Sequence, residues 1–300
     1  MLLLKDFKRL TIEDKPIFEK FYKKYPPVHS DYIFTTLISW MDYGNYQYAI
    51  LNENIILISQ IEGKLRFRPP IGENKKEVFD QVLDLAREQS SDCPYGMITS
   101  DKKDWMEKNY SNLSFREHRG FFDYVYLASD LAELSGSDLS KIRNRLNKFK
   151  KTYEYKVENI SKKNFEEIKE FLKRWCLWKD CESDPILNNE RKAILFSMDN
   201  FFELGLSGLA IRINDNIEAI SVFEKYSFDT AVVHYEKGSP EYDGIYKAIN
   251  QETANILQKD VRFINRESDM DLPGLRKAKL SYRPHHMVKV YHLCKEDISF

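Results

Sequence analysis

The sequence predicts an α/β protein of two similar domains, each with a mixed, mostly antiparallel sheet flanked by helices. Three observations lead to this prediction. The chain has 300 residues, of which 42% are hydrophobic, enough for two cores. Short runs with the two-residue period of strands come in groups of three, each followed by a glycine-containing loop and a helix. This order of elements occurs twice, so we predict domains at residues 1–129 and 130–300.

The first half begins with helical spacing and then changes to strand spacing. Pro26 and Pro27 end the first helix, and Asp31 is a possible N-cap of the second. The predicted helices are residues 14–25, 31–40, 75–89 and 102–109, and the predicted strands are 46–51, 55–60, 65–68, 95–99 and a long strand at 115–127.

The second half repeats that order with little residue identity, which indicates a structural duplication. The predicted helices are residues 137–151, 165–179, 187–204, 242–258 and 273–280, and the predicted strands are 155–160, 208–213, 217–224, 230–237, 261–265 and 287–294.

Composition limits the classes of function. The net charge of -1 means that any nucleic acid or anionic membrane must be held by a local patch. Four cysteines are too few and too scattered for a disulfide framework, and we interpret Cys176 and Cys181 as packing residues. The first residues lack the pattern of a signal peptide, and no apolar run is long enough to cross a bilayer, so we expect a cytoplasmic protein.

The predicted helix at 137–151 carries cations on every face except a buried stripe of Ile142, Leu146 and Phe149. Its polar positions include Lys141, Arg143, Asn144, Arg145, Lys148, Lys150 and Lys151. Cations without local acids repel one another, which favours a phosphate-binding surface for tRNA, a coenzyme or an anionic head group. The alternative is a solvated helix balanced by acids from elsewhere in the chain.

A second polar stretch follows the predicted strand at 261–265. Acidic residues come directly after the strand, and a short basic helix follows them. The stretch contains Asn265, Glu267, Asp269, Asp271, Arg276, Lys277 and Lys279. Strand ends in α/β proteins commonly carry binding sites. The alternative is a surface turn whose acids and bases simply pair with each other.

The end of the strand at 230–237 is a third candidate. His234 and Glu236 lie two residues apart and so share one face of the strand. His234 is either a general base or, more commonly for a lone histidine in a strand, a satisfied core group. The following loop contains Gly238 and Gly244 but lacks closely spaced glycines, and its acids argue against a pyrophosphate there. No metal-binding motif is present.

The element order is similar to that of the Gcn5-related N-acyltransferase (GNAT) fold, repeated in tandem. Residues 141–148, 236–237, 242–250 and 265–284 resemble the synthase domain of phosphatidylglycerol lysyltransferases and its free-standing bacterial relatives. The resemblance covers nearly the whole chain and is stronger in the second half. It implies a tandem acyltransferase-like fold related to Fem-type enzymes, which take an amino acid from aminoacyl-tRNA.

The resemblance also implies a site in the second domain. The residues expected in catalysis are Glu236, Glu267, Asp269 and Lys279. Those expected to bind substrate are Lys141, Asn144, Arg145, Lys148, Lys237, Gly244, Tyr246, Asn250, Asn265, Arg276 and Tyr282. Chemically, Glu267 or Asp269 would orient the nucleophile, and Arg276 and Lys279 would stabilise negative charge.

The expected function is transfer of an aminoacyl group from aminoacyl-tRNA to a small-molecule or lipid acceptor. Two alternatives stay open: N-acylation from an acyl-coenzyme A donor, and a binding module without catalysis. The lysyltransferases that the sequence resembles pair this domain with membrane spans, and none is predicted here, which weakens the expectation of a lipid acceptor. The acceptor, the amino acid and the oligomeric state are left open.

Overall fold

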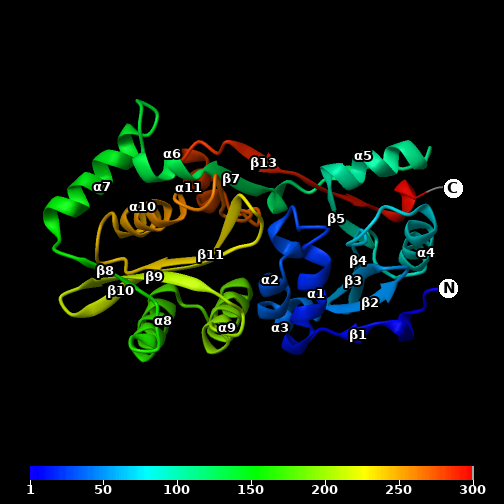
Figure 1. Cartoon of the computed structure of the whole chain (residues 1–300), viewed down its shortest axis with the longest axis horizontal. Coiled ribbons are helices and arrows are strands. Elements are labelled where there is room, and N and C mark those ends of the chain that lie inside the picture. The colour runs from blue at the N-terminus through cyan, green and yellow to red at the C-terminus, as the bar shows by residue number, and fades with distance from the viewer. Residues whose placement is uncertain (299–300) are drawn as a thin grey trace. The chain divides into compact units, whose positions relative to one another are not determined.

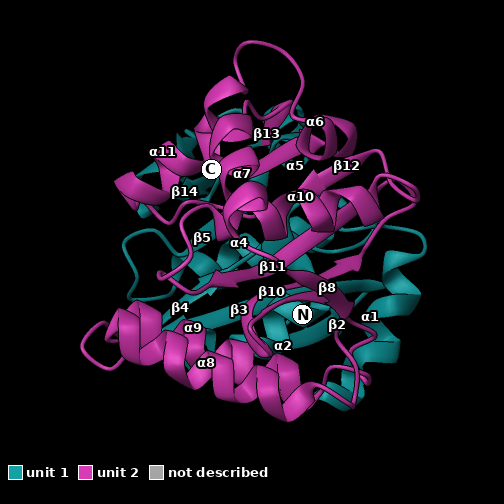
Figure 2. Cartoon of the chain, turned by 90° about the vertical axis from the view of Figure 1, so that its left-hand side faces the viewer, with its two compact units in different colours: residues 1–122, 288–300 teal, residues 123–287 magenta. Residues whose placement is uncertain are grey.

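The computed structural model describes residues 1–298, and the chain divides into two compact units. Unit 1 comprises residues 1–122 and 288–300, and unit 2 comprises residues 123–287 (Figure 2). The boundary predicted after residue 129 differs from this division in two ways. The chain passes from unit 1 to unit 2 after Phe122 rather than after residue 129. It returns to unit 1 at Val288.

Both differences come from an exchange of strands between the two halves of the sequence. The predicted strand at 115–127 is two strands, β6 (Arg116–Glu117) and β7 (Asp123–Leu127), separated by a 3-10 turn. The predicted strand at 287–294 is likewise β13 (His286–Val288) and β14 (Val290–Leu293). β6 and β14 belong to the sheet of unit 1, whereas β7 and β13 belong to that of unit 2. The sequence pattern did not reveal either break because the fragments on both sides of each break are extended.

The two sheets have the same strand order. It is β1-β2-β3-β4-β5-β14-β6 in unit 1 and, from the opposite end, β8-β9-β10-β11-β12-β7-β13 in unit 2. In each sheet the meander strands pair antiparallel, and one neighbouring pair is parallel: β4 with β5, and β11 with β12. The predicted fold of two mixed, mostly antiparallel sheets flanked by helices is therefore confirmed.

Unit 1 follows the predicted order of elements closely. Its helices are α1 (Lys15–Tyr22), α2 (Phe34–Ser39), α3 (Met41–Gly44), α4 (Lys76–Arg87) and α5 (Ser100–Asn109); its other strands are β1 (Lys8–Arg9), β2 (Gln47–Leu51), β3 (Asn54–Ile61), β4 (Lys64–Phe67) and β5 (Tyr95–Thr99). The prediction that Asp31 caps the second helix is wrong. Asp31 lies in a 3-10 turn, Ser30–Tyr32, and α2 begins only after Ile33.

Unit 2 repeats the order with longer helices. Its helices are α6 (Ala128–Glu133), α7 (Ser140–Thr152), α8 (Phe165–Lys179), α9 (Pro185–Asp199), α10 (Ile245–Leu257) and α11 (Pro273–Ser281); its other strands are β8 (Lys156–Asn159), β9 (Ser207–Ile213), β10 (Asn216–Lys225), β11 (Thr230–Gly238) and β12 (Phe263–Asn265). Asp184 caps α9, because its Oδ1 accepts hydrogen bonds from the amides of Ile186 and Leu187.

The sheet of unit 2 lies between two helical layers, with α8 and α9 on one face and α7 and α10 on the other (Figure 1). Its central strand β10 is therefore buried on both faces from Ile217 to Phe223. Phe149 of α7, Ile211 of β9 and Ile249 of α10 are completely buried in the core on the α10 side. This core fixes the strand ends and α10, which carry the polar groups described below.

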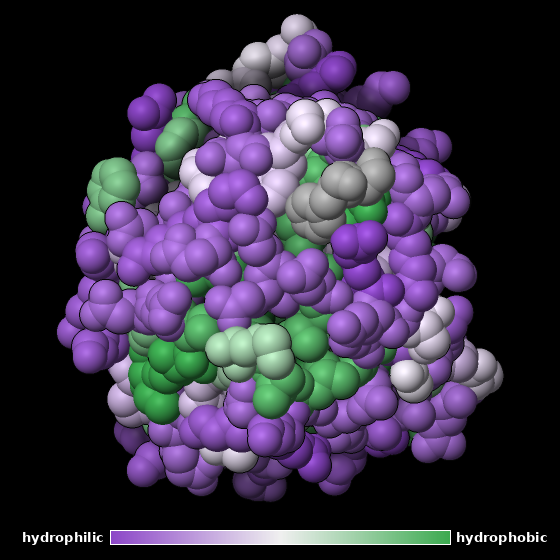
Figure 3. Space-filling view, turned by 90° about the vertical axis from the view of Figure 1, so that its right-hand side faces the viewer, coloured by the Kyte–Doolittle hydropathy of each residue, from purple (hydrophilic) through white to green (hydrophobic). Residues whose placement is uncertain are grey.

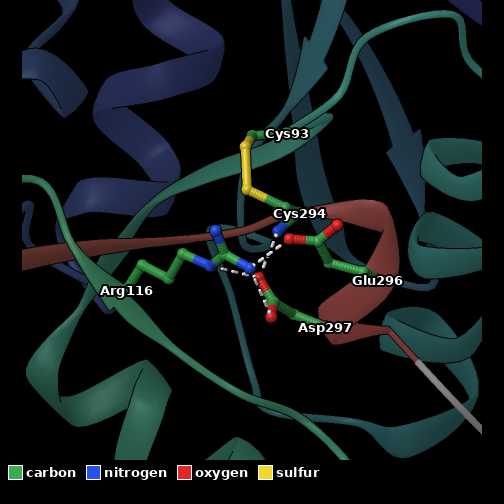
Figure 4. Close-up of a disulfide and its surroundings, with 5 residues drawn as sticks. All are labelled: Cys93, Arg116, Cys294, Glu296 and Asp297. Atoms are coloured by element: carbon green, nitrogen blue, oxygen red, sulfur yellow. Dashed lines mark hydrogen bonds and ion pairs between the residues drawn. A yellow bond between two sulfur atoms is a disulfide. The ribbon is translucent and has the colours of Figure 1, made fainter.

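The structure holds two disulfides, which corrects the expectation that the cysteines pack without pairing. Cys93 bonds Cys294 across a sequence separation of 201 residues, and Cys176 bonds Cys181. The first disulfide joins the segment before β5 to the residue after β14 (Figure 4). Beside it, Nε of Arg116 lies 2.8 Å from Oδ2 of Asp297. Strand exchange brings these distant cysteines together, and sequence spacing alone does not reveal it.

The surface is largely hydrophilic on the face shown in Figure 3, with a band of apolar side chains across its lower half and smaller apolar groups above it. Among residues 1–298, no helix is both long enough and apolar enough to span a bilayer.

Candidate functional site

A cavity opens in unit 2 where its two parallel strands separate. β11 and β12 pair only from Thr230–Val232 and Phe263–Asn265. Beyond these residues β11 continues to Gly238, while the chain after Asn265 turns away through Glu267, whose φ is 57°. The resulting cavity has a volume of about 750 Å³ and is lined by the end of β11, the turn after β12, and residues of α8 to α11. Crevices beyond the carboxyl ends of parallel strands are common binding sites.

The cavity brings together part of the predicted site. The predicted residues that line it are Arg145, Glu236, Lys237, Gly244, Tyr246, Glu267, Lys279 and Tyr282. The predicted residues that do not line it are Lys141, Asn144, Lys148, Asn250, Asn265, Asp269 and Arg276.

Glu236 is held in place from two sides. Its Oε1 accepts a hydrogen bond of 3.1 Å from Nδ2 of Asn250, and its Oε2 pairs with Nη2 of Arg266. The side chains of Glu236 and Arg266 are 10% and 15% exposed. Asn250 is buried and reaches the cavity only through Glu236, so it is a positioning residue rather than a substrate ligand.

His234 connects the interior of the sheet to the cavity. It is the extra residue of a β-bulge, because Tyr235 pairs with Val222 and Val233 with Phe223. Its Nε2 lies 2.9 Å from Oε1 of Glu224, and its Nδ1 lies 3.0 Å from Oε1 of Glu267. Both ring nitrogens thus have acceptors, and Glu267 itself lines the cavity.

Burial of His234 favours the neutral ring, but the two carboxylates outweigh burial and raise its pKa to about 9. His234 is therefore an imidazolium at neutral pH, and its N–H groups donate to Glu224 and Glu267. Burial raises the pKa of Glu267, which is the property required of a carboxylate that accepts a proton. A histidine held as an imidazolium is not itself a base, so the possible role of His234 as a general base is not supported.

Lys279 is occupied by backbone groups rather than free in the cavity. Its Nζ donates to the carbonyl oxygens of Arg266, Glu267 and Ser268 at 2.5, 3.0 and 2.6 Å. Burial and the neighbouring Arg266 lower the pKa of this amine to about 8. An ammonium has three N–H bonds, and the turn uses all of them. Lys279 therefore stabilises the turn that presents Glu267, and its expected role as a catalytic cation stays a prediction.

Asp269 and Arg276 pair with each other, as the alternative for this stretch predicted. Asp269 is completely buried and accepts hydrogen bonds from Arg276 at 2.8 and 2.9 Å and from the hydroxyl of Tyr124 at 2.5 Å. Burial opposes ionisation of Asp269, but these donors hold its pKa at about 2. Arg276 also pairs with Asp271. Neither Asp269 nor Arg276 lines the cavity, so we do not retain them as catalytic or substrate-binding residues.

Asn265 is likewise part of the framework. It is completely buried, its Nδ2 donates to Oδ2 of Asp123, and its Oδ1 accepts from the backbone amide of Glu267 at 2.7 Å. Because the side chain folds back onto the residue two positions later, it stabilises the left-handed conformation of Glu267. The prediction placed Asn265 among the substrate ligands, and the structure places it beneath the site.

The basic helix α7 is partly balanced by an acid from another element. Arg145 lies 2.5 Å from Oδ1 of Asp243, and Lys148 lies 3.6 Å from Oδ2 of the same residue. Lys141 and Asn144 are exposed, so α7 keeps polar groups that face solvent. Arg145 and Lys148 therefore follow the alternative interpretation, in which acids from elsewhere in the chain balance the charge of the helix. Lys141 and Asn144 remain exposed and can contact a binding partner.

Gly244 allows α10 to pack closely on α7. Its φ is 96°, and an added Cβ would lie 2.9 Å from Cβ of Phe149 and 3.0 Å from the carbonyl oxygen of Arg145. A larger residue would therefore meet both left-handed strain and a clash. The glycine predicted to bind substrate has this packing role.

Lys237 and Tyr246 form another part of the cavity lining. Nζ of Lys237 lies 2.8 Å from Oε1 of Glu190 and 4.2 Å from the centre of the Trp175 ring. Nε1 of Trp175 donates to the hydroxyl of Tyr246 at 3.2 Å. This wall combines an aromatic surface with a neutralised cation, which suits an uncharged part of a ligand.

Among the cavity residues that sequence reasoning missed are Arg266, Lys247, Trp175 and Glu190. Arg266 lies between the predicted Asn265 and Glu267, and Lys247 follows the predicted Tyr246. Their positions in the segments that carry the family resemblance were a usable signal. Trp175 and Glu190 come from α8 and α9, and only the fold brings these helices to the cavity.

A second cluster of possible ligand atoms lies away from the cavity. In unit 1, ligand atoms of Cys93, His292 and Cys294 lie within 4.8 Å of one another. Both sulfur atoms belong to the disulfide, so the cluster does not offer thiolates in this state.

The fold and the cavity identify the class of protein: it is a tandem GNAT-like protein with its candidate site in the second unit. Residues 22–294 match the family model described as "Phosphatidylglycerol lysyltransferase, C-terminal". The chain belongs to this family, which confirms the resemblance and places the protein in an aminoacyl transferase family.

Three solved structures are similar over nearly the whole chain. A conserved protein of unknown function from Bacteroides thetaiotaomicron is 31% identical with a TM-score of 0.88, covering 96% of this chain and 98% of the other. L-PGS from Bacillus licheniformis is 12% identical with a TM-score of 0.61, covering 96% and 93%. FemX is 9% identical with a TM-score of 0.57, covering 97% and 98%. The last two share the fold with this chain.

Proposed function

We propose that the protein transfers an aminoacyl group from aminoacyl-tRNA to a small-molecule or lipid-borne acceptor. One observation carries this beyond family membership: the turn after β12 presents Glu267 to the cavity, where it contacts the buried His234, whose other ring nitrogen contacts Glu224. This arrangement supplies an oriented carboxylate of raised pKa at the expected position of the reaction.

In the proposed reaction, a hydroxyl or amine of the acceptor attacks the ester carbonyl of the donor. The new bond joins that oxygen or nitrogen to the acyl carbon, and the bond from the acyl carbon to the ribose oxygen breaks. Glu267 accepts the proton of the nucleophile and returns it to the leaving ribose oxygen. The His234 imidazolium holds Oε1 of Glu267, which leaves Oε2 to accept that proton. Glu236, fixed by Asn250 and Arg266, lines the same cavity and helps to hold the substrate.

The exposed part of α7 supports the tRNA donor. Lys141 and Lys151 face solvent, and phosphate contacts by such residues make binding depend on salt. The loop after β11 supports coenzyme A less well. Asp243 in that loop already pairs with Arg145, and Glu241 adds a second carboxylate where a pyrophosphate would be held.

The test uses the purified chain, labelled bulk aminoacyl-tRNA and separate small-molecule and lipid acceptor fractions. We expect saturable binding by fluorescence anisotropy that weakens with salt, and loss of the label from tRNA only when an active acceptor fraction is added. Glu267→Gln should lower transfer roughly 100-fold or more while leaving tRNA binding intact. Glu241→Gln is the matched control, because this acid lies in the loop after β11 but does not line the cavity.

Failure to bind aminoacyl-tRNA at low and at physiological salt would overturn the proposal. Binding and turnover of coenzyme A thioesters would then support an acyl-coenzyme A enzyme. Ligand binding without any turnover, unaffected by Glu267→Gln, would support a module without catalysis.

A further inference from the structure

Arg266 has hydrogen-bonding capacity that the protein does not use. Arg266 lines the cavity of unit 2, and its Nη2 pairs with Glu236. Its Nε and Nη1 are buried, and among the described residues neither has a hydrogen-bond partner. These two nitrogens carry three N–H bonds. Buried donors are nearly always paired, so unpaired ones beside a cavity indicate a missing acceptor.

The aromatic neighbours of Arg266 do not replace that acceptor. Its Cζ lies 5.8 Å from the centre of the Tyr126 ring and 5.0 Å from that of Tyr282. Ring faces stabilise the charge of a guanidinium, whereas its N–H bonds need oxygen atoms. Glu236 supplies one carboxylate on one nitrogen, which leaves Nε and Nη1 for another partner.

Lys247 adds a second cation to the same wall. It lies in the first turn of α10, and its Nζ is 4.6 Å from the centre of the Tyr282 ring. Among residues 1–298, no hydrogen bond or ion pair is formed by this ammonium. Burial and the charges of Arg266 and Arg145 favour the neutral amine, Glu236 opposes them, and the pKa of Lys247 is lowered to about 8.

The local charge is therefore positive at neutral pH. Arg266 and Lys247 flank Tyr282, and Glu236 is the carboxylate that acts on both. Two cations kept together in a partly buried place repel each other, so a bound anion would relieve the repulsion. A planar guanidinium and a flexible ammonium are together the usual ligands of phosphate and carboxylate oxygens.

We propose that Arg266 and Lys247 form a subsite for an oxyanionic group, a phosphate or a carboxylate, of the substrate. A small rotation of the guanidinium brings its unpaired N–H groups toward an anion in the cavity, and Glu236, held by Asn250, keeps the side chain at the wall. The inference rests on the proposed function, because the same cavity would hold the donor or the acceptor. It adds that one of them is recognised through a negative charge next to the reacting ester.

The experiment uses the full chain without tRNA. Thermal unfolding is measured during titration with sodium phosphate and with sodium acetate, against sodium chloride of the same ionic strength. We expect a saturable rise of the unfolding temperature with at least one of the two anions beyond that with chloride. Lys247→Met should weaken the apparent affinity about 10-fold, the loss of one charged contact. Lys259→Met is the control, because Lys259 is exposed just after α10 and does not line the cavity.

Arg266 is tested by Arg266→Lys, which keeps the charge beside Glu236 and removes the fork of N–H donors. Anion binding should weaken at least 10-fold in this variant while circular dichroism is unchanged. In the wild type, binding should weaken as pH rises through about 8, since Lys247 then loses its charge. That pH dependence should be smaller in Lys247→Met, where Lys279 and His234, which line the same cavity and have pKa values of about 8 and about 9, are left to cause the remainder.

The source of the anion is resolved by competition. A CCA trinucleotide that displaces phosphate in the wild type and not in Lys247→Met indicates a phosphate of the tRNA end. Displacement by glycerol phosphate alone indicates a phosphate of the acceptor. Displacement by acetate alone indicates a carboxylate. Phosphate and acetate that act no differently from chloride, or that act equally on wild type and both variants, would overturn the subsite. Anion binding without aminoacyl-tRNA binding would keep the subsite and reject the proposed function.

Discussion

Nδ1 of His234 lies 3.0 Å from Oε1 of Glu267, and Nε2 of the same ring lies 2.9 Å from Oε1 of Glu224. The ring is buried, and its β-bulge sets it between a carboxylate in the sheet and one that lines the cavity. Since both carboxylates need the charged ring, the proton on His234 is linked to the stability of the protein and to the orientation of Glu267.

The contribution of His234 to stability should fall as pH rises from about 6.5 to about 9. The folded pKa of His234 is raised from 6.5 to about 9, so its contribution is complete below the unfolded value and lost as pH passes the folded one. The shift corresponds to at most about 3 kcal/mol. Urea unfolding at several pH values measures it, and His234→Gln should remove that part of the pH dependence. An unchanged slope in His234→Gln would show that other groups cause the decline.

Lys279→Met should destabilise the protein by about 2–4 kcal/mol, because three carbonyl oxygens lose their donor at once. The measurement is urea unfolding followed by tryptophan fluorescence. Lys277→Met, an exposed residue of α11, is the control and should change stability by less than about 0.5 kcal/mol. A Lys279→Met protein of wild-type stability but without activity would instead favour the catalytic role that the sequence predicted.

Gly244→Ala should destabilise unit 2 more than Gly136→Ala. Both glycines have left-handed φ values, 96° and 84°, so both variants carry backbone strain of about 1 kcal/mol. Only at Gly244 would the new Cβ also meet Phe149 and Arg145, whereas nothing lies within 4 Å at Gly136. We expect an additional loss of about 1–3 kcal/mol at Gly244 in chemical unfolding. Equal losses would show that α7 moves away from α10 without cost.

Removal of the Cys93–Cys294 disulfide should cost more stability than removal of the Cys176–Cys181 disulfide. The two bonds close loops with sequence separations of 201 and 5 residues. Loop-closure entropy gives upper values of about 5 and about 2 kcal/mol. Unfolding of the two double-alanine variants, with and without a reducing agent, compares them. A reducing agent should then destabilise Cys93→Ala/Cys294→Ala by no more than the roughly 2 kcal/mol of the remaining Cys176–Cys181 disulfide, and a larger effect would contradict the assignment.

Much of the fold could be predicted from the sequence, because strand and helix periods are local properties. The predicted helix at 165–179 and the predicted strand at 95–99 have the observed bounds. The break between β6 and β7 could not be predicted in this way. Its fragments belong to two sheets, and which sheet an extended segment joins depends on partners far along the chain.

The candidate site shows the same difference between what local sequence predicts and what depends on distant parts of the chain. The sequence determined the segments that carry it, since Glu236, Glu267 and Tyr282 do line the cavity. The tertiary structure decided how each polar group is used: Asp269 and Lys279 are consumed by neighbours in the turn, while Arg266 and Lys247 keep unused donors. The reason is that a charged side chain acts through the partners left to it after folding. Those partners are set by distances across elements, which sequence order does not contain.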